Sequence, residues 1–231
     1  MIYLVSDIHG CYNTFQKLLK KIKFSNKDTL ICLGDAIDRG KHNLAILDFF
    51  METKNVKLIK GNHEFFYECW VNQLLSEREW WNFGGKTTIM ELKNKTVDEI
   101  LKYYNYIHHL PIYHEFDDYV LSHNGFNANF PFIKDENGII NITETIDAQY
   151  KHHSYNFIIS SDIHFMPKLK LNKKMIVGHY PTLRLNGPNI FNSKNCIDID
   201  CGATYSGGRL ACLCLDTMQE YYVHIEENDV D

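Results

Sequence analysis

Short apolar runs recur along the chain, and each of them ends in a polar turn. Five such runs occupy residues 2–5, 29–33, 56–59, 119–121 and 175–177. They are short and rich in valine, isoleucine and leucine, which is typical of interior strands. We therefore expect five buried strands, each followed by a turn of charged, amide or histidine side chains.

Helical patterns fill the gaps between the first three runs. Residues 13–22 place their apolar side chains on one helix face and their lysines off it. Residues 44–50 fill the next gap in the same way. Because strands alternate with helices, the pattern favours the α/β fold class over a helix bundle.

The middle of the chain departs from this alternation. Residues 64–110 look mainly helical and aromatic, and WWNFGG at 80–85 is expected to form a glycine-containing loop among them. Segment 124–174 is the least regular part of the chain. With no internal repeat and no clear linker, we expect one domain over residues 1–231, with a helical insertion at about 64–118.

Beyond Pro188 the pattern returns to β. Residues 196–200 precede a Gly-Gly turn, and the apolar runs 210–215 and 221–225 follow it. The last two runs are close enough in sequence to predict a β-hairpin.

Composition narrows the class of protein. The chain has 231 residues, 45% hydrophobic and 23% charged, which is typical of a globular protein with a substantial core. Its formal net charge of −5 argues against a general nucleic-acid binder, which needs a basic surface.

Location and partners follow from other sequence features. The N-terminal stretch MIYLVSDIHG lacks a basic segment, and no stretch approaches the roughly 20 apolar residues of a spanning helix, so we expect no membrane partner. Seven scattered cysteines without a CxxC pair predict reduced thiols in a cytoplasmic protein. The oligomeric state stays open.

The turns after the five runs carry the candidate chemistry. They read SDIHG (6–10), GDAIDRG (34–40), KGNHE (60–64), SHNG (122–125) and GHYPT (178–182). Since ligands bind at the carboxyl ends of strands in open α/β sheets, we expect these turns to meet. Any one of them alone is weak, because an Asp-x-His triplet is more often a turn and a lone histidine is more often structural.

Together the turns offer carboxylate, imidazole and amide ligands, a mixture that suits manganese, iron or zinc. Asp7 and His9 could hold one ion, and a second group could hold another, consisting of Asn62, His123 and His179. Two ions about 3.5–4 Å apart need a bridging carboxylate, and Asp35 is the natural candidate.

The series of turns resembles the signature motifs of phosphoprotein phosphatases, which belong to the calcineurin-like metallophosphoesterase superfamily. Motif order matches nearly end to end. Two further stretches, WNFGGKTT (81–88) and IDIDCGATYSGGRLACLCLD (197–216), resemble the bacterial and phage branch. That branch includes lambda-type protein phosphatases and symmetrical diadenosine tetraphosphate hydrolases.

The resemblance implies a four-layer α/β/β/α sandwich of mixed sheets with flanking helices. It implies two divalent metal ions, manganese first and iron, zinc or cobalt as alternatives, held by Asp7, His9, Asp35, Asn62, His123 and His179. It also implies direct attack by a hydroxide that bridges the two ions. His63 is implied as general acid, oriented by Asp38, and Arg39 as a phosphate ligand. Asn62 and His63 are expected to contact the substrate as well.

One departure from the family concerns phosphate binding. These phosphatases usually carry a second phosphate-binding arginine between the two late histidines, yet no arginine lies between Asn124 and Gly178. Either a lysine from 168–174, Arg184 or Arg209 takes its place, or phosphate binding is weaker or differently shaped.

Three functions fit the sequence. The leading hypothesis is a phosphomonoesterase acting on phosphoserine or phosphothreonine in proteins. The alternative is a dinucleoside polyphosphate hydrolase, motivated by the bacterial-type C-terminal stretch and the absent arginine. The third is a phosphate-binding module without catalysis, against which intact His63 and Asp38 argue. The expected partner is therefore a phosphorylated protein or a small phosphorylated or nucleotide substrate.

Neighbouring residues have plainer expected roles. Glu64 is expected to cap a helix or to orient a ligand. Trp70, Trp80 and Trp81 are expected to be packing residues, with base stacking as the alternative.

Overall fold

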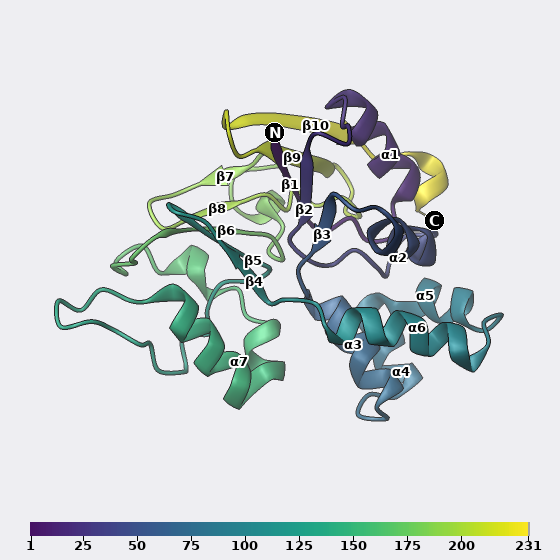
Figure 1. Ribbon diagram of the computed structural model, residues 1–231, viewed down its shortest axis with the longest axis horizontal. Helices are drawn as coiled ribbons and strands as arrows, with labels where there is room; N and C mark the ends of the chain where they lie inside the picture. The colour runs from purple at the N-terminus through teal and green to yellow at the C-terminus, as the bar shows by residue number, and fades with distance from the viewer. Residues whose placement is uncertain (231) are drawn as a thin grey trace.

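The computed structural model, which describes residues 1–230, contains two five-stranded sheets (Figure 1). The first sheet has the order β10-β9-β1-β2-β3. Its strands are β1 (Ile2–Val5), β2 (Thr29–Cys32), β3 (Val56–Leu58), β9 (Arg209–Cys214) and β10 (Gln219–His224). β1, β2 and β3 are parallel, and β9 runs antiparallel to β1. β9 and β10 form the expected antiparallel hairpin.

The second sheet has the order β4-β5-β6-β8-β7. Its strands are β4 (Tyr113–Glu115), β5 (Tyr119–Ser122), β6 (Lys174–Val177), β7 (Phe191–Asn192) and β8 (Cys196–Asp198). β5, β6 and β8 are parallel. All five apolar runs of the sequence are therefore strands, three in the first sheet and two in the second.

The alternation of side chains along β1 explains the layering. Tyr3 and Val5 pack with α1 (Tyr12–Lys21) and α2 (Asn43–Glu52), whereas Leu4 packs toward the second sheet. Successive side chains of a strand point to opposite faces, so both faces of the first sheet are buried. A third cluster lies between the second sheet and α7 (Ile142–Ile158). The predicted α/β/β/α order of layers is confirmed.

A run of helices joins β3 to β4, packed beside the first sheet (Figure 1). These are α3 (Asn62–Val71), α4 (Glu77–Trp80), the π-helical turn Trp81–Gly85, α5 (Lys86–Leu92) and α6 (Val97–His108). Residues 80–85, expected to form a loop, are mostly helical, but the backbone at Gly84 is non-helical and marks a kink there. The helices end at His108, and β4 then lies inside the segment predicted as an insertion. The division into one domain stays a prediction.

Helix α7 lies within segment 124–174, where the sequence pattern predicted no helix. Its buried positions include Thr145 and Gln149, so polar residues interrupt the apolar pattern that would reveal a helix. A backbone break at His153 interrupts it further. Short 3-10 helices complete the fold at η2 (Asp162–Phe165), η3 (Thr182–Arg184) and η4 (Glu227–Asp229). Among residues 1–230, no helix has the length and apolar character to cross a membrane.

Candidate metal centre

The candidate site lies where the carboxyl ends of strands from both sheets meet. β1, β2 and β3 lead into the turns of Asp7, Asp35 and Asn62, and β5 and β6 lead into those of His123 and His179. All five side chains are buried except His179, which is partly exposed. The structure therefore brings the residues of separate motifs into one cluster, as the sequence predicts.

The first donor group is centred on His9. Its Nε2 lies 3.8 Å from Asp7 Oδ1 and 3.8 Å from Asp35 Oδ2. Its Nδ1 lies 3.0 Å from the carbonyl oxygen of Ile37, to which it can donate a hydrogen bond. That bond fixes the ring and leaves the Nε2 lone pair facing the two carboxylates, which is the usual arrangement of a metal-ligating histidine.

The second donor group is centred on His123. Its Nε2 lies 2.9 Å from Asn62 Oδ1, 3.1 Å from His179 Nδ1 and 3.3 Å from Asp35 Oδ1. Its Nδ1 lies 2.8 Å from the carbonyl oxygen of Leu33.

The surroundings of His123 require positive charge. Because Nδ1 donates to a carbonyl, Nε2 faces three acceptors and needs either a proton or a cation among them. Burial lowers the pKa of His123, but Asp35 outweighs it and raises the pKa to about 10. Burial and His123 together lower the pKa of neighbouring His179 to about 3. The donor set therefore fits a divalent cation.

Asp35 belongs to both donor groups. Oδ2 faces His9, and Oδ1 faces His123. Two sets of potential metal ligands share this carboxylate, and within each set the donor atoms lie within 4.8 Å of one another. The first set is His9, Asp35 and His63, and the second is Asp35, His123 and His179. Burial alone would raise the pKa of Asp35, yet the histidines lower it well below its ordinary value. The geometry fits a bridging carboxylate, and the assignment of individual ligands stays a prediction.

His63 and Asp38 form the expected pair. His63 Nδ1 lies 2.6 Å from Asp38 Oδ2, and its Nε2 faces the site 3.8 Å from Asp35 Oδ2. Burial lowers the pKa of His63, but Asp35 and Asp38 outweigh it and raise the pKa above its ordinary value. His63 therefore lies beside the donor groups with its ring held by Asp38, which is the position expected of a general acid, and that role stays a prediction.

Two residues that hold Asp38 were missed in the sequence. Trp80 Nε1 donates to Asp38 Oδ2 at 2.8 Å, and the Thr88 hydroxyl donates to Asp38 Oδ1. Trp80 is fully buried, so it packs as expected but also carries a polar contact. For Thr88 the signal was the stretch WNFGGKTT (81–88), which the sequence offered only as a family resemblance, and Trp80 lies one residue before that stretch.

We expect Trp80→Phe to lower turnover by about 10-fold, because it removes a hydrogen bond to a charged group worth about 1.5–3 kcal/mol while keeping most of the ring. As a positioning effect through His63, the loss in kcat is expected to be larger for substrates with poor leaving groups. Steady-state kinetics on a graded series of aryl phosphates measures it.

The matched control is Trp81→Phe, since Trp81 adjoins Trp80 and is exposed. Equal losses for all leaving groups in Trp80→Phe would mean that Trp80 only supports packing.

Arg39 lies next to His63 and Tyr205, and no ion pair joins it to Asp38 among residues 1–230. Its Nη2 lies 3.4 Å from His63 Nε2, and its Nη1 donates to the Tyr205 hydroxyl at 3.3 Å. Its backbone N–H donates to the Gly84 carbonyl at 3.0 Å. The partly exposed guanidinium thus lies beside His63, where its planar fork suits two phosphate oxygens.

The backbone of the site is unusual. Six of its residues have positive φ although none is glycine, namely Asp7, His9, Asp35, Asp38, Arg39 and His179. Such conformations cost free energy and cluster at functional sites. The motif glycines give the ligands room, because a Cβ at Gly61 would lie 2.3 Å from Asp35 Oδ1.

Glu64 has the role that the sequence predicts. Its carboxylate accepts backbone N–H groups of Asp35, Ala36 and Gly61 at 2.8–2.9 Å. Burial and Asp35 raise the pKa of Glu64 to about 7. It therefore clamps the turn that carries Asp35 to the start of α3.

A second buried pair lies behind the cluster. His164 Nε2 is 2.5 Å from Asp198 Oδ2, and both side chains are buried. The tetrapeptide SDIH of residues 6–9 recurs at 161–164 and there includes His164. No hydrogen bond joins either side chain of this pair to a predicted ligand among residues 1–230.

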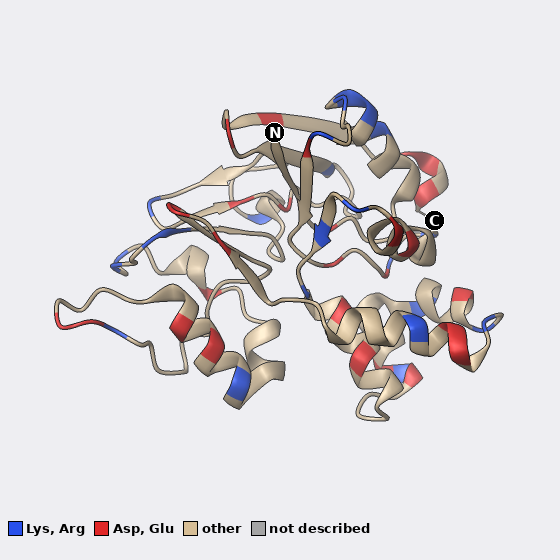
Figure 2. Ribbon diagram, viewed as in Figure 1, with Lys and Arg blue, Asp and Glu red and all other residues tan. Residues whose placement is uncertain are grey.

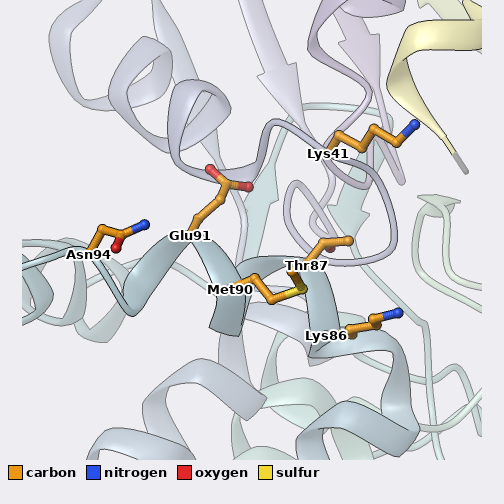
Figure 3. A pocket seen from close by; sticks show the side chains of 6 residues that line it. All are labelled: Lys41, Lys86, Thr87, Met90, Glu91 and Asn94. Carbon is orange, nitrogen blue, oxygen red and sulfur yellow. The ribbon is translucent and has the colours of Figure 1, made fainter.

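A cavity of about 400 Å³ beside α5 is separate from this site (Figure 3). Its lining residues are Lys41, Lys86, Thr87, Met90, Glu91 and Asn94, none of which is a predicted site residue. Glu91 is committed to the start of α2, where it accepts the N–H groups of Asn43 at 2.7 Å and Leu44 at 3.1 Å.

Sequence relatives bear on the substrate. A symmetrical bis(5'-nucleosyl)-tetraphosphatase of Haemophilus ducreyi is 45% identical over 64 residues, which is 27% of this chain and 24% of that protein. One from Coxiella burnetii is 37% identical over 65 residues, 28% of this chain and 22% of that protein. The matches thus span about a quarter of the relatives' length. Their names support the dinucleoside polyphosphate alternative, and the leading expectation of a protein phosphatase is corrected accordingly.

Solved structures and a family model bear on the fold. A structure described as a putative diadenosine tetraphosphatase has a TM-score of 0.63 at 16% identity, covering 98% of this chain and 94% of that one. A protein serine/threonine phosphatase from Saccharomyces cerevisiae has a TM-score of 0.58 at 16% identity, covering 98% of this chain and 80% of that one. The family model described as calcineurin-like phosphoesterase matches residues 1–208. With a fold, a cluster of ligands and a family model in agreement, the chain belongs to the calcineurin-like phosphoesterases.

Proposed function

We propose that this protein is a metal-dependent hydrolase of dinucleoside tetraphosphates that releases nucleoside diphosphates. The observation that carries the reaction class is one carboxylate, Asp35, shared by two donor groups beside a His63–Asp38 pair and a guanidinium. The names of the sequence relatives support the substrate class.

The proposed ligands are Asp7, His9, Asp35, Asn62, His123 and His179. When bound, two divalent cations would supply an activated water and neutralise phosphate charge. Manganese is the first metal to test, with iron, zinc and cobalt as alternatives. Substrate positioning and proton transfer would be carried out by side chains of the protein.

Arg39 would bind two oxygens of the attacked phosphate and hold it in line. The activated water loses one proton to solvent, its oxygen forms the new bond to phosphorus, and the bond from that phosphorus to the oxygen shared with the next phosphate breaks. His63 would donate its proton to that shared oxygen as the nucleoside diphosphate leaves. Asp38 keeps the His63 ring oriented through Nδ1.

Chromatography of reaction products tests the proposal. With manganese present, we expect diadenosine tetraphosphate to give adenosine diphosphate with a kcat/KM well above that for a phosphoserine peptide. Removing metal with a chelator is expected to stop both reactions. A protein that hydrolyses p-nitrophenyl phosphate but leaves the dinucleotide intact would overturn the proposed substrate class.

A further inference from the structure

Arg184 lies close to the candidate site and has no carboxylate partner. It ends η3, which begins three residues after His179. Its Cζ lies 5.7 Å from the ring centroid of Tyr180 and 5.9 Å from that of Tyr205. The side chain is exposed, and no ion pair joins it to a carboxylate among residues 1–230. Its charge is therefore free to meet an anion.

Tyr205 links Arg184 to Arg39. The Cζ of Arg39 lies 5.4 Å from the same ring centroid, and Arg39 donates to the Tyr205 hydroxyl. Arg39 and Tyr205 also line a cavity of about 330 Å³ together with Thr204 and Val230. The guanidinium groups of Arg39 and Arg184 thus both lie near the ring of Tyr205. Arg39 is the one that also lies next to His63.

The other replacements for the absent arginine are less suitable. Arg209 donates to the carbonyl of Pro188 and to the side chain of Asn189, and its guanidinium lies 4.2 Å from the Tyr222 ring centroid. The N–H donors on its Nε and Nη2 are therefore already used.

The lysines of 168–174 lie at the amino end of β6, whereas the candidate site lies at its carboxyl end. Lys174 begins this strand, whereas His179 follows its carboxyl end. At about 3.3 Å per residue, the length of β6 separates the lysine-rich segment from the site. Figure 2 shows this basic segment where the chain enters β6. Lys173 is moreover paired with Glu115 at 2.9 Å.

A polyphosphate chain differs from a monoester in charge beyond the reacting phosphorus. The further phosphates of a dinucleoside tetraphosphate carry negative charge away from the reacting phosphorus, and a second arginine beside Arg39 can bind their oxygens. An arginine held over aromatic rings is pre-organised for such contacts, since less side-chain freedom is lost on binding.

We propose that Arg184, held by Tyr180 and Tyr205, binds the non-reacting phosphates of a polyphosphate substrate and thereby favours polyphosphates over monoesters. This role rests on the proposed function. It adds to the site a specificity-determining residue outside the motifs that carry the family resemblance.

The first test measures selectivity. For Arg184→Gln, we expect the ratio of kcat/KM for diadenosine tetraphosphate to kcat/KM for p-nitrophenyl phosphate to fall about 10- to 100-fold, as for the loss of a charged hydrogen bond. Most of the fall is expected in KM for the dinucleotide. Arg184→Lys should recover part of it, because lysine keeps the charge but loses the planar fork. An unchanged ratio in Arg184→Gln would overturn the proposal.

The control is Arg78→Gln, which removes the same charge from an exposed arginine on α4 and should leave the ratio unchanged. An equal fall in this control would mean that net charge alone sets selectivity, against the proposal.

The second test needs no turnover and separates the two proposals. Inorganic tripolyphosphate is titrated calorimetrically into metal-free wild-type protein and Arg184→Gln, with inorganic phosphate for comparison. We expect the substitution to weaken tripolyphosphate binding about 10-fold and phosphate binding much less. If the wild type leaves diadenosine tetraphosphate intact, the proposed function fails. Arg184-dependent tripolyphosphate binding would still support the subsite, and Arg184-independent binding would overturn it.

Discussion

Asp35→Asn is expected to lower hydrolysis by about 10³-fold or more, because charge stabilisation by a metal site is worth several kcal/mol. The neutral amide offers one acceptor oxygen and one NH₂ group, whereas the carboxylate turns one oxygen to each donor group. A residue shared by both groups should also affect both ions. We therefore expect metal content, measured by mass spectrometry after equilibration with manganese, to fall from two equivalents to one or fewer.

The matched control is Asp117→Asn, the same change at an exposed position. It should keep both activity and metal content. Two full equivalents of metal in Asp35→Asn, with wild-type turnover, would show that Asp35 is not a bridging ligand.

His63→Asn is expected to lower kcat by about 10²- to 10⁴-fold for substrates with poor leaving groups, which is the usual contribution of general acid catalysis. Phosphate esters of simple alcohols leave as alkoxides and need the proton. p-Nitrophenolate is stable without it, so its ester should lose much less. Rates for a series of leaving groups with graded pKa values measure the difference.

The slope of log kcat against leaving-group pKa decides whether His63 acts as the general acid. It should steepen in His63→Asn and stay unchanged in His152→Asn, which alters an exposed histidine on α7. Parallel slopes in wild type and His63→Asn would assign His63 to substrate binding alone.

The sequence predicted the position of the site because its turns follow the carboxyl ends of strands. Asp7, Asp35 and His179 lie far apart in sequence, but the topology of an α/β sheet brings such turns together. The role of Glu64 could be predicted for a different reason. An acidic residue at the start of a helix can accept hydrogen bonds from the free backbone N–H groups there.

Other parts of the site depend on packing that no local pattern reveals. Trp80 reaches Asp38 across 42 residues of sequence. The positive φ of Asp38 could not be predicted from the sequence either, because glycine is the residue usually found at such backbone conformations. Helix α7 was missed since polar residues occupy part of its buried face.

Strand β1 lies between β2 and β9. Tyr3 and Val5 pair with Cys214 and Cys212, which leave the ribosome more than 200 residues later. Until then the nascent chain carries an unpaired edge of apolar strand, a surface that invites pairing with other chains. A premature stop before β9 leaves the first sheet unfinished, so this sheet can be completed only after β9 has been synthesised.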